Sequence, residues 1–287
     1  STPMEPGTQL TAQEPDDPPG VIVKETYQML VGTLLYLTVW TRPDLVFATQ
    51  QLAKWSHDPH VKHMNAGMRV LGYLRGTKTL GITYTRGQPN ANRLLGWADA
   101  DWVPAGTKCS RSTSGYVSTL NGGALSWKCR QVKSVAKSTS DADFVAASRA
   151  SDDILFLRRV LKEAGFKQRT STPLYSETSR CCLISENPVK DDRSKHIDYR
   201  IHALRERVQD GIICPTDCAP GHMLADVLTK NLPESVFVKH RTALAGLAEP
   251  HVTPKDIKAQ RSCAYHLRAG AWVDGTSPEY SFYLRNL

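Results

Sequence analysis

Several features that define common protein classes are missing from this sequence. It has no run of about 18 apolar residues, so we expect no membrane-spanning helix and no membrane partner. Its seven cysteines are irregularly spaced without a CxxC pair, which fits neither a disulfide scaffold nor a zinc ribbon. The first 20 residues lack Lys and Arg, unlike a signal or transit peptide, and begin with Ser1, which indicates a processed chain or a fragment. We expect an intracellular protein of a reducing compartment, in the cytoplasm, the nucleus or an organelle such as the mitochondrion.

What is present indicates a folded, basic protein. The 287 residues are 40% hydrophobic and 22% charged, which excludes collagen-like and fully disordered classes and suits one large domain or two small ones. Lys and Arg number 36 against 28 Asp and Glu, giving a net charge of +8 and a pI near 9.1. A positive excess favours a polyanionic partner, nucleic acid first. The alternative is a basic soluble protein without such a partner.

The chain divides into four regions. Residues 1–22 are rich in Pro, Gly and acid and predict an extended arm. Residues 23–90 predict a helical segment from their apolar periodicity. Residues 91–247 predict a domain in which hairpin strands come first and then alternate with helices, an order that favours a mixed α/β sheet. Residues 248–287 have weak patterning and form a C-terminal extension.

Local patterns predict the individual elements. Apolar periodicity predicts helices over residues 27–37, 45–55, 60–74, 140–164, 179–185, 196–209 and 222–230. Short apolar runs predict strands over residues 81–84, 94–102, 114–120, 124–128, 173–176 and 211–215. Between two of these strands lies Asn121-Gly122-Gly123, a strong signal for a β-hairpin.

A pair of acids lies inside an apolar strand. Asp99 and Asp101 follow the strand period of two, so they share one face with Trp97. A carboxylate in mid-strand is costly to desolvate unless it is paired or bound to a metal. The pattern indicates a functional site, and the alternative is a solvated strand edge.

Residues 1–247 contain several short motifs, and their order along the chain is informative. They are Leu30-Val31-Gly32-Thr33-Leu34-Leu35-Tyr36-Leu37, Thr41-Arg42-Pro43-Asp44, Tyr73-Leu74-Arg75-Gly76-Thr77, Ala98-Asp99-Ala100-Asp101-Trp102, Arg111-Ser112-Thr113-Ser114-Gly115-Tyr116, Lys195-His196-Ile197-Asp198 and Leu224-Ala225-Asp226-Val227-Leu228-Thr229-Lys230. The motifs and their order resemble those at the end of the reverse transcriptase and in the ribonuclease H domain of copia-type retrotransposon polyproteins. The resemblance implies an α/β fold, a ribonuclease H-like mixed sheet with flanking helices, preceded by a small helical segment from the end of a reverse transcriptase. It begins beyond the polymerase's paired-aspartate centre, so we expect no polymerase activity.

The resemblance also implies a set of site residues. Active members of the family use four carboxylates that hold two Mg²⁺ ions. Carried over position by position, these catalytic and metal-binding residues are Asp99, Asp143, Glu177 and Asp226. The family has Glu at the second position and Asp at the third, so two of the four side chains differ in length by one methylene, about 1.5 Å. A displacement of about 1 Å can cost about 10²-fold in rate. We therefore expect a degenerate site, with Mg²⁺ as cofactor if the chain is active and none otherwise.

A basic stretch follows the first acid of the set. Residues 102–137 contain six Lys and Arg and no Asp or Glu, which predicts a basic rim beside Asp99 that grips phosphates. We expect the nucleic-acid-binding residues to be Lys108, Arg111, Lys128, Arg130, Lys133, Lys137, Arg180, Lys195 and His196. The interleaved Trp102, Tyr116 and Trp127 either stack on bases or belong to the core, and we favour the core.

The leading functional interpretation is a domesticated retrotransposon-derived protein. It binds RNA, as structured RNA or an RNA–DNA hybrid, with weak catalysis or none, inside a ribonucleoprotein such as a ribosome or an organellar particle, with other proteins as partners. Two alternatives stay open. One is an active, Mg-dependent ribonuclease H that cleaves RNA in RNA–DNA hybrids, and the other is a protein-interaction scaffold without nucleic acid.

Overall fold

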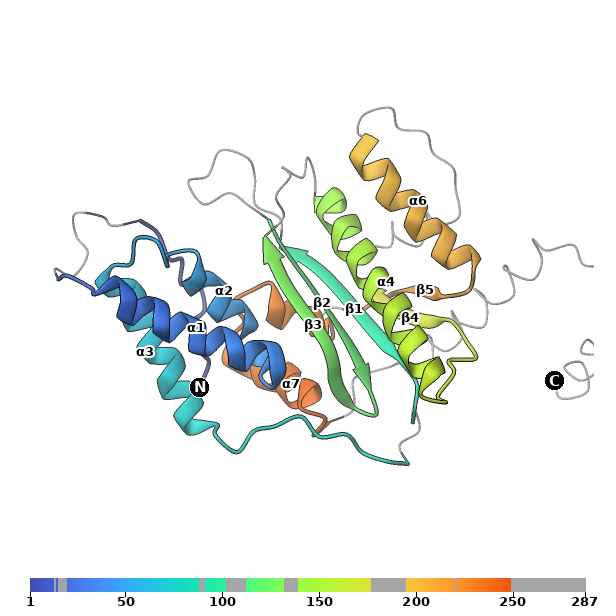
Figure 1. Ribbon diagram of the computed structural model, residues 1–287, viewed down its shortest axis with the longest axis horizontal. Helices are drawn as coiled ribbons and strands as arrows, with labels where there is room; N and C mark the ends of the chain where they lie inside the picture. Colours follow the sequence, from blue (N-terminus) through green and yellow to red (C-terminus); the bar gives the residue numbers. More distant parts are fainter. Residues whose placement is uncertain are drawn as a thin grey trace, which may run out of the picture.

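A computed structural model describes most of the chain (Figure 1). The described residues are 1–12, 14, 20–87, 91–101, 112–131, 139–176, 195–219 and 221–248, and residues 139–141 and 195–198 are described by their backbone alone. The helix predicted over residues 179–185 and nearly all of the extension 248–287 lie outside these ranges. Within the described ranges, no helix is long and apolar enough to cross a membrane.

A five-stranded mixed sheet forms the centre of the fold. Its strands are β1 Leu95–Asp101, β2 Thr113–Leu120, β3 Gly123–Gln131, β4 Thr172–Ser176 and β5 Ile213–Asp217. Their order across the sheet is β3-β2-β1-β4-β5. The first three strands pair antiparallel, and β4 and β5 continue parallel to β1. This confirms the predicted ribonuclease H-like mixed sheet with flanking helices, preceded by a small helical segment.

The hairpin between β2 and β3 forms where the sequence predicts it. Leu120 pairs with Gly123, which leaves a two-residue loop. Asn121 and Gly122 both have positive φ, 50° and 88°, as a type I′ turn requires. The hairpin fixes the register of β2, and β2 in turn sets the register of β1.

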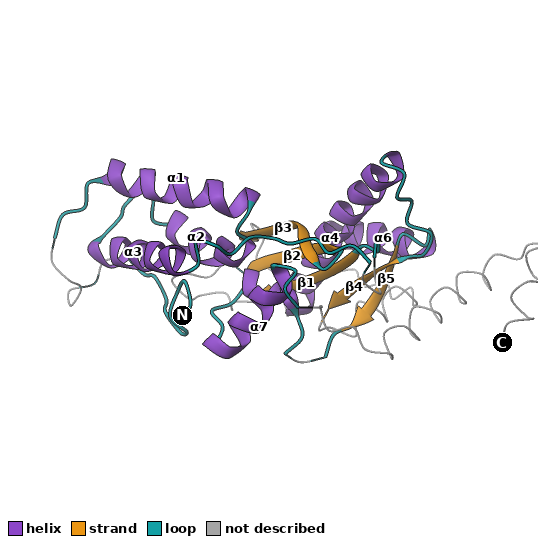
Figure 2. Ribbon diagram, turned by 90° about the horizontal axis from the view of Figure 1, so that it is seen from below, coloured by secondary structure: helices purple, strands orange, loops and turns teal. Residues whose placement is uncertain are grey.

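The helices fall into two groups. The helical segment before the sheet contains α1 Lys24–Trp40, the 3₁₀ helix η1 Pro43–Leu45, α2 Val46–Ala53 and α3 Val61–Gly76. The later elements are α4 Thr139–Glu163, α6 Lys195–Gln209, the 3₁₀ helix η2 Leu224–Leu228 and α7 Glu234–Leu244. Figure 2 shows α4 and α6 on one side of the sheet, with α7 on the other side toward α1, α2 and α3.

Two local predictions are wrong, and one helix has no prediction. Residues 81–84 form no strand, because Thr83 N–H donates to Ala245 O rather than to a strand ladder. The helix predicted over 222–230 is the shorter η2. The helix α7 was not predicted, although Pro233 precedes it and its buried residues Phe237, His240, Ala243 and Leu244 follow a helical spacing.

The sheet separates two apolar cores. On one face, Ala98 and Leu174 pack with Ile154 of α4. On the other face, Trp97 and Tyr175 stack with ring centroids 5.2 Å apart. The core around this stack is continuous with the interior of the helical segment and with η2 and α7. The helical segment and the sheet therefore share one core, and the division at residue 90 remains a prediction from sequence.

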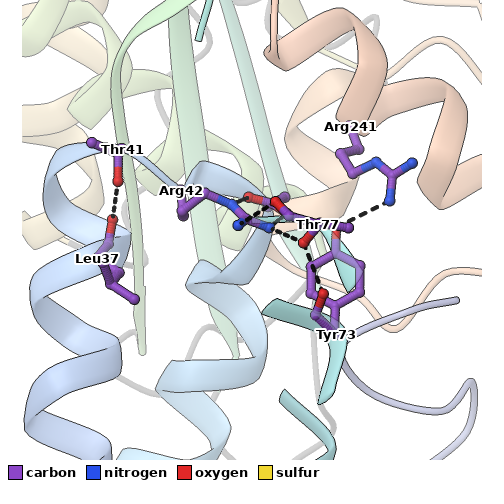
Figure 3. A network of polar contacts seen from close by, with 7 residues as sticks. Leu37, Thr41, Arg42, Tyr73, Thr77 and Arg241 are labelled. Carbon is purple, nitrogen blue, oxygen red and sulfur yellow. Dashed lines mark hydrogen bonds and ion pairs between the residues drawn. The ribbon is translucent and has the colours of Figure 1, made fainter. Parts of the chain in front are cut away.

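A buried polar network joins the helical segment to α7 (Figure 3). Arg42 donates from Nε and Nη2 to the two carboxylate oxygens of Asp44, at 2.9 and 2.8 Å, and both side chains are buried. Tyr73 Oη donates to Asp44 Oδ2 at 2.7 Å, and Arg241 Nη1 of α7 donates to Tyr73 Oη at 3.2 Å. Burial, and then the Asp44 charge, raise the pKa of Tyr73, so its hydroxyl stays protonated and keeps donating.

Replacing Asp44 with Ala should lower the free energy of unfolding by about 3–5 kcal/mol, because the Arg42 guanidinium would stay buried without its counter-charge. Urea unfolding followed by circular dichroism measures this. The matched control is Asp58→Ala, which removes an exposed carboxylate 3.3 Å from His60 and should cost no more than about 1 kcal/mol. Equal losses in the two variants would contradict the assignment of the network as a stabilising contact.

His240 makes stability depend on pH. It is buried on α7, and its Nε2 has no hydrogen-bond partner in the described part of the chain. Burial, and then the charges of Lys239 and His222, lower the pKa of His240 to about 4. An unfolded histidine has a pKa of about 6.5, so the unfolded chain binds this proton first as the pH falls. The stabilising effect of neutral His240 is complete above pH ~6.5 and is lost as the pH falls from there toward 4.

We expect His240→Gln to flatten the decline of the unfolding free energy between pH 7 and pH 4.5, since Gln does not titrate. The measurement is urea unfolding at a series of pH values. His202→Gln, at an exposed position of α6, should keep the wild-type slope. An unchanged slope in His240→Gln would show that other groups set the pH dependence.

Candidate functional site

Asp99 is held on the face of the sheet that meets η2. It lies near the end of β1, and its side chain is 4% exposed. The Thr229 hydroxyl, just after η2, donates to Asp99 Oδ2. This contact needs a close approach of η2 to the sheet, and Gly115, the partner of Asp99 on β2, leaves room for it. A Cβ at Gly115 would lie 2.8 Å from Thr229 Cγ2 and 2.9 Å from Leu228 Cβ.

Asp226 on η2 joins Asp99 through a lysine. Lys230 Nζ lies 2.9 Å from Asp226 Oδ1 and 3.3 Å from Asp99 Oδ2. Both carboxylates are largely buried, and the Lys230 side chain is 32% exposed. The structure thus brings together two of the four predicted acids, 127 positions apart in the chain, with an ammonium group between them.

Asp101 is a third carboxylate near Asp99 and Lys230, and their charges act on it. Burial is the main cause that raises the pKa of Asp101, and the negative charge of Asp99 raises it further. The positive charges of Lys230 and Lys54 act in the opposite direction. Lys54 follows α2, so the helical segment contributes positive charge to the same face of the sheet.

The other two predicted acids are placed differently. Asp143 is half-buried near the start of α4, and its neighbour Ala142 packs in the same core as Ala98 and Ala100. The start of α4 lies at the end of the sheet where β1 finishes (Figure 1). Glu177 lies outside the described residues. In the described part of the chain, no group of three or more His, Cys, Asp or Glu is arranged to hold a metal ion.

The Asp99–Asp226 pair nevertheless fits part of a magnesium site. Mg²⁺ prefers oxygen ligands and is commonly held by one or two carboxylates together with substrate phosphates. Asp99 and Asp226 would hold the ion, and Lys230 now contacts the same oxygens. When bound, Mg²⁺ would activate a water molecule and stabilise the leaving oxygen of a phosphodiester.

A basic cluster lies at the same level of the sheet but on the opposite face. Lys128 and Arg130 are exposed on β3, and they alternate with the buried Cys129, which shares the Asp99 face. Arg149 of α4 donates to Ser114 Oγ at 3.0 Å. Burial, and then the positive charges of Arg200 on α6 and of Arg130, lower the pKa of Arg149. We call Lys128, Arg130, Arg149 and Arg200 the basic cluster.

Sequence reasoning missed half of this cluster. Arg149 and Arg200 are separated by 51 positions, and only the packing of α4 against α6 brings their charges together. Of the other predicted binding residues, Lys108, Arg111, Lys133, Lys137 and Arg180 lie outside the described residues, and Lys195 and His196 are placed only as backbone in the first turn of α6.

The predicted aromatic residues serve the fold where they are described. Trp127 packs against the core beside the helical segment, and its Nε1 donates to Thr38 O at 2.7 Å. Tyr116 is half-buried, with its hydroxyl 3.5 Å from Asp153. Trp102 lies outside the described residues. The described aromatics are therefore structural, as we favoured from the sequence.

Comparison with known proteins relates the chain to retrotransposons. No protein-family model matches it. It is 34% identical over 218 residues to the retrovirus-related Pol polyprotein from transposon TNT 1-94 of Nicotiana tabacum, a match covering 76% of this chain and 16% of that polyprotein. It is 40% identical over 131 residues to the secreted RxLR effector protein 161 of Plasmopara viticola, covering 46% of this chain and 90% of that protein. Among solved structures it is similar to LC11-RNase H1 in complex with an RNA/DNA hybrid, with a TM-score of 0.35 and 12% identity, over 48% of this chain and 94% of that one. The chain spans only 14–16% of the length of the Pol polyproteins it matches.

Gly115→Ala should loosen the contact that holds Asp99. The new methyl group would meet Thr229 and Leu228, and we expect a loss of about 1–3 kcal/mol in the free energy of unfolding. Urea unfolding measures the loss. The control is Gly72→Ala on α3, where a Cβ meets nothing within 4 Å and the change should be neutral or stabilising by up to about 1 kcal/mol. A neutral Gly115→Ala would mean that η2 does not need this close approach.

Proposed function

Since this chain belongs to the family of copia-type retrotransposon Pol proteins, we propose that it is a domesticated, ribonuclease H-like RNA-binding protein with weak catalysis or none. In this role it is a structural component of a ribonucleoprotein and binds structured RNA or an RNA–DNA hybrid. The observation that carries the proposal is the pair of altered acids, Asp143 and Glu177, in a set whose other two members, Asp99 and Asp226, meet at one ammonium group.

The altered acids support weak catalysis. Asp143 is one methylene shorter than the Glu of the family motif, and Glu177 is one methylene longer than the Asp. Mg²⁺ requires nearly octahedral geometry with ligand distances of about 2.0–2.1 Å, so a carboxylate displaced by about 1 Å is a poor ligand. One side chain is shorter and the other is longer, but both are still carboxylates. The total negative charge of the four acids is therefore unchanged, which allows residual metal binding.

The positive side chains support nucleic-acid binding. The basic cluster and the pair Lys54 and Lys230 lie on opposite faces of the same end of the sheet. A nucleic acid crossing this end would meet cationic groups from both faces, including Lys54 of the helical segment. Contacts to phosphates provide affinity without sequence specificity and weaken as salt rises.

The second candidate is an active, Mg-dependent ribonuclease H that cleaves the RNA strand of RNA–DNA hybrids. One specific observation favours it, since Asp99 and Asp226 converge although they come from β1 and η2. In that case the two aspartates hold the metal, and the basic cluster orients the backbone of the hybrid.

The proposal is tested with the full-length chain and fluorescently labelled RNA hairpin, RNA–DNA hybrid and duplex DNA. We expect binding to RNA in EDTA, with an affinity that falls steeply between 50 and 200 mM salt, as is typical of about 6–10 phosphate contacts. With Mg²⁺, gel analysis of the hybrid should show cleavage far slower than by an active ribonuclease H run in parallel. Rapid cleavage would favour the second candidate. Absence of RNA binding would overturn both and leave the protein-interaction scaffold.

Two variants of equal charge locate the binding surface. Lys128→Ala with Arg130→Ala should weaken RNA binding and reduce the slope of log affinity against log salt by about 1–2. The control, Arg159→Ala with Lys162→Ala, removes one Arg and one Lys from exposed positions near the other end of α4. Its salt slope should stay close to that of the wild type, and an equal loss in both variants would show that only net charge matters.

The acid set has its own test. Combining Asp143→Glu with Glu177→Asp restores the side-chain lengths of the family motif. We expect this variant to cleave the hybrid at least about tenfold faster than the wild type, since a misplacement of about 1 Å costs on the order of 10²-fold. An unchanged rate would show that the altered lengths are not what limits catalysis.

A further inference from the structure

Two consecutive residues bind the same buried carboxylate. Thr229 donates its hydroxyl proton to Asp99 Oδ2, and the next residue, Lys230, places Nζ 3.3 Å from that oxygen and 3.4 Å from Asp99 Oδ1. Lys230 also lies 2.9 Å from Asp226 Oδ1. Its ammonium thus contacts both carboxylates of the pair.

We propose that Lys230 is an internal competitor for the divalent cation, so that a metal ion binds the Asp99–Asp226 pair only when the Lys230 ammonium leaves it. The inference deepens the proposed function and rests on it for the view that the site is weakly catalytic. It assigns to one residue of the chain the control of metal affinity at this site.

The geometry supports a direct exchange. The oxygens that Lys230 contacts are those that would bind the metal. A metal ion on the same oxygens would lie close to the Lys230 ammonium, and two cations so close together repel each other strongly. With Lys230 in place, the pair and its counter-ion carry a net charge of −1 rather than −2. A divalent cation is therefore attracted less strongly and must also displace the lysine.

Lys230 is also able to leave. Asp99 and Asp226 have side chains 4% and 11% exposed, whereas the Lys230 side chain is 32% exposed. The carboxylates are fixed in the fold, but the lysine reaches them from the solvent side on a flexible four-carbon stem. We expect exchange with a metal ion to proceed by rotation of that stem.

The first experiment measures the binding of Mg²⁺ and Mn²⁺ to the full-length chain by isothermal titration calorimetry, without nucleic acid. Lys230→Met keeps the length of the side chain and removes the charge, and we expect it to bind either ion about 10- to 100-fold more tightly than the wild type. Lys230→Arg keeps the charge and should bind as weakly as the wild type. Lys162→Met, with the same loss of charge at the far end of α4, should also match the wild type.

Adding Asp226→Asn to Lys230→Met should abolish the gain, which places the tighter site at the carboxylate pair. The proposal is overturned if Lys230→Met binds no more tightly than the wild type, if Lys162→Met gains as much, or if the gain survives Asp226→Asn. RNA binding in EDTA is measured on the same variants, so a failure of the lysine inference is distinguishable from a failure of RNA binding.

A second experiment uses the unmodified chain and does not depend on a variant that folds. Lysine acetylation, read by peptide mass spectrometry, reports how accessible each ammonium group is. We expect Mg²⁺ to increase the modification of Lys230 several-fold and to leave that of Lys162 unchanged. Modification of Lys230 that stays constant up to saturating Mg²⁺, in a chain that binds the ion, would overturn the proposal.

Discussion

The burial of the Asp99 carboxylate is the constraint on which the site depends. A charged group removed from water in mid-sheet needs hydrogen bonds and a counter-charge, and this structure supplies both from the turn after η2. Thr229 provides the donor and Lys230 the charge. To reach Asp99, that turn must lie directly on the sheet, which is possible because β2 carries Gly115 opposite the carboxylate.

The turn that holds Asp99 also depends on contacts between the sheet and the helical segment. η2 belongs to the apolar core that contains Trp97 and Tyr175 of the sheet, and this core continues into the helical segment. The Arg42–Asp44–Tyr73 network then ties the helical segment to α7, the helix that follows η2. The position of the turn that holds Asp99 is therefore set from both sides, by the sheet beneath it and by the helices beside it.

Sequence alone predicted the sheet, the hairpin and most helices, because alternation, helical periodicity and the Asn121-Gly122 turn are local signals. It did not predict α7, and it predicted a helix longer than η2. The apolar stretches before and after Pro233 are both short, and only tertiary packing shows that the first forms a 3₁₀ helix and the second an α-helix. Strand alternation alone indicated Asp99, whereas Asp143, Glu177 and Asp226 were predicted only through the family resemblance. Asp99 and Asp226 meet in space, whereas nothing local in the sequence indicates that they do.

The role of Lys230 is the clearest example of a feature that the sequence alone does not predict. It stands four residues after Asp226, a spacing that an ordinary exposed ion pair on a helix would also have. Only the fold brings Asp99 of β1 to the same ammonium group. Lys230 therefore contacts two buried carboxylates, Asp99 and Asp226, instead of one. Likewise, the composition of residues 102–137 predicted that Lys128 and Arg130 belong to a basic rim, but only the packing of α4 against α6 brings Arg149 and Arg200 to them.

The continuous core has an evolutionary consequence. A gene segment encoding only the sheet and its later helices would yield a protein in which β3 had lost its contact with α2 and the shared core had lost the side chains of the helical segment. The smallest segment that encodes the complete core thus includes the helical segment as well as the sheet and its later helices. Recombination breakpoints that preserve a working product should fall upstream of α1 rather than in the linker before β1.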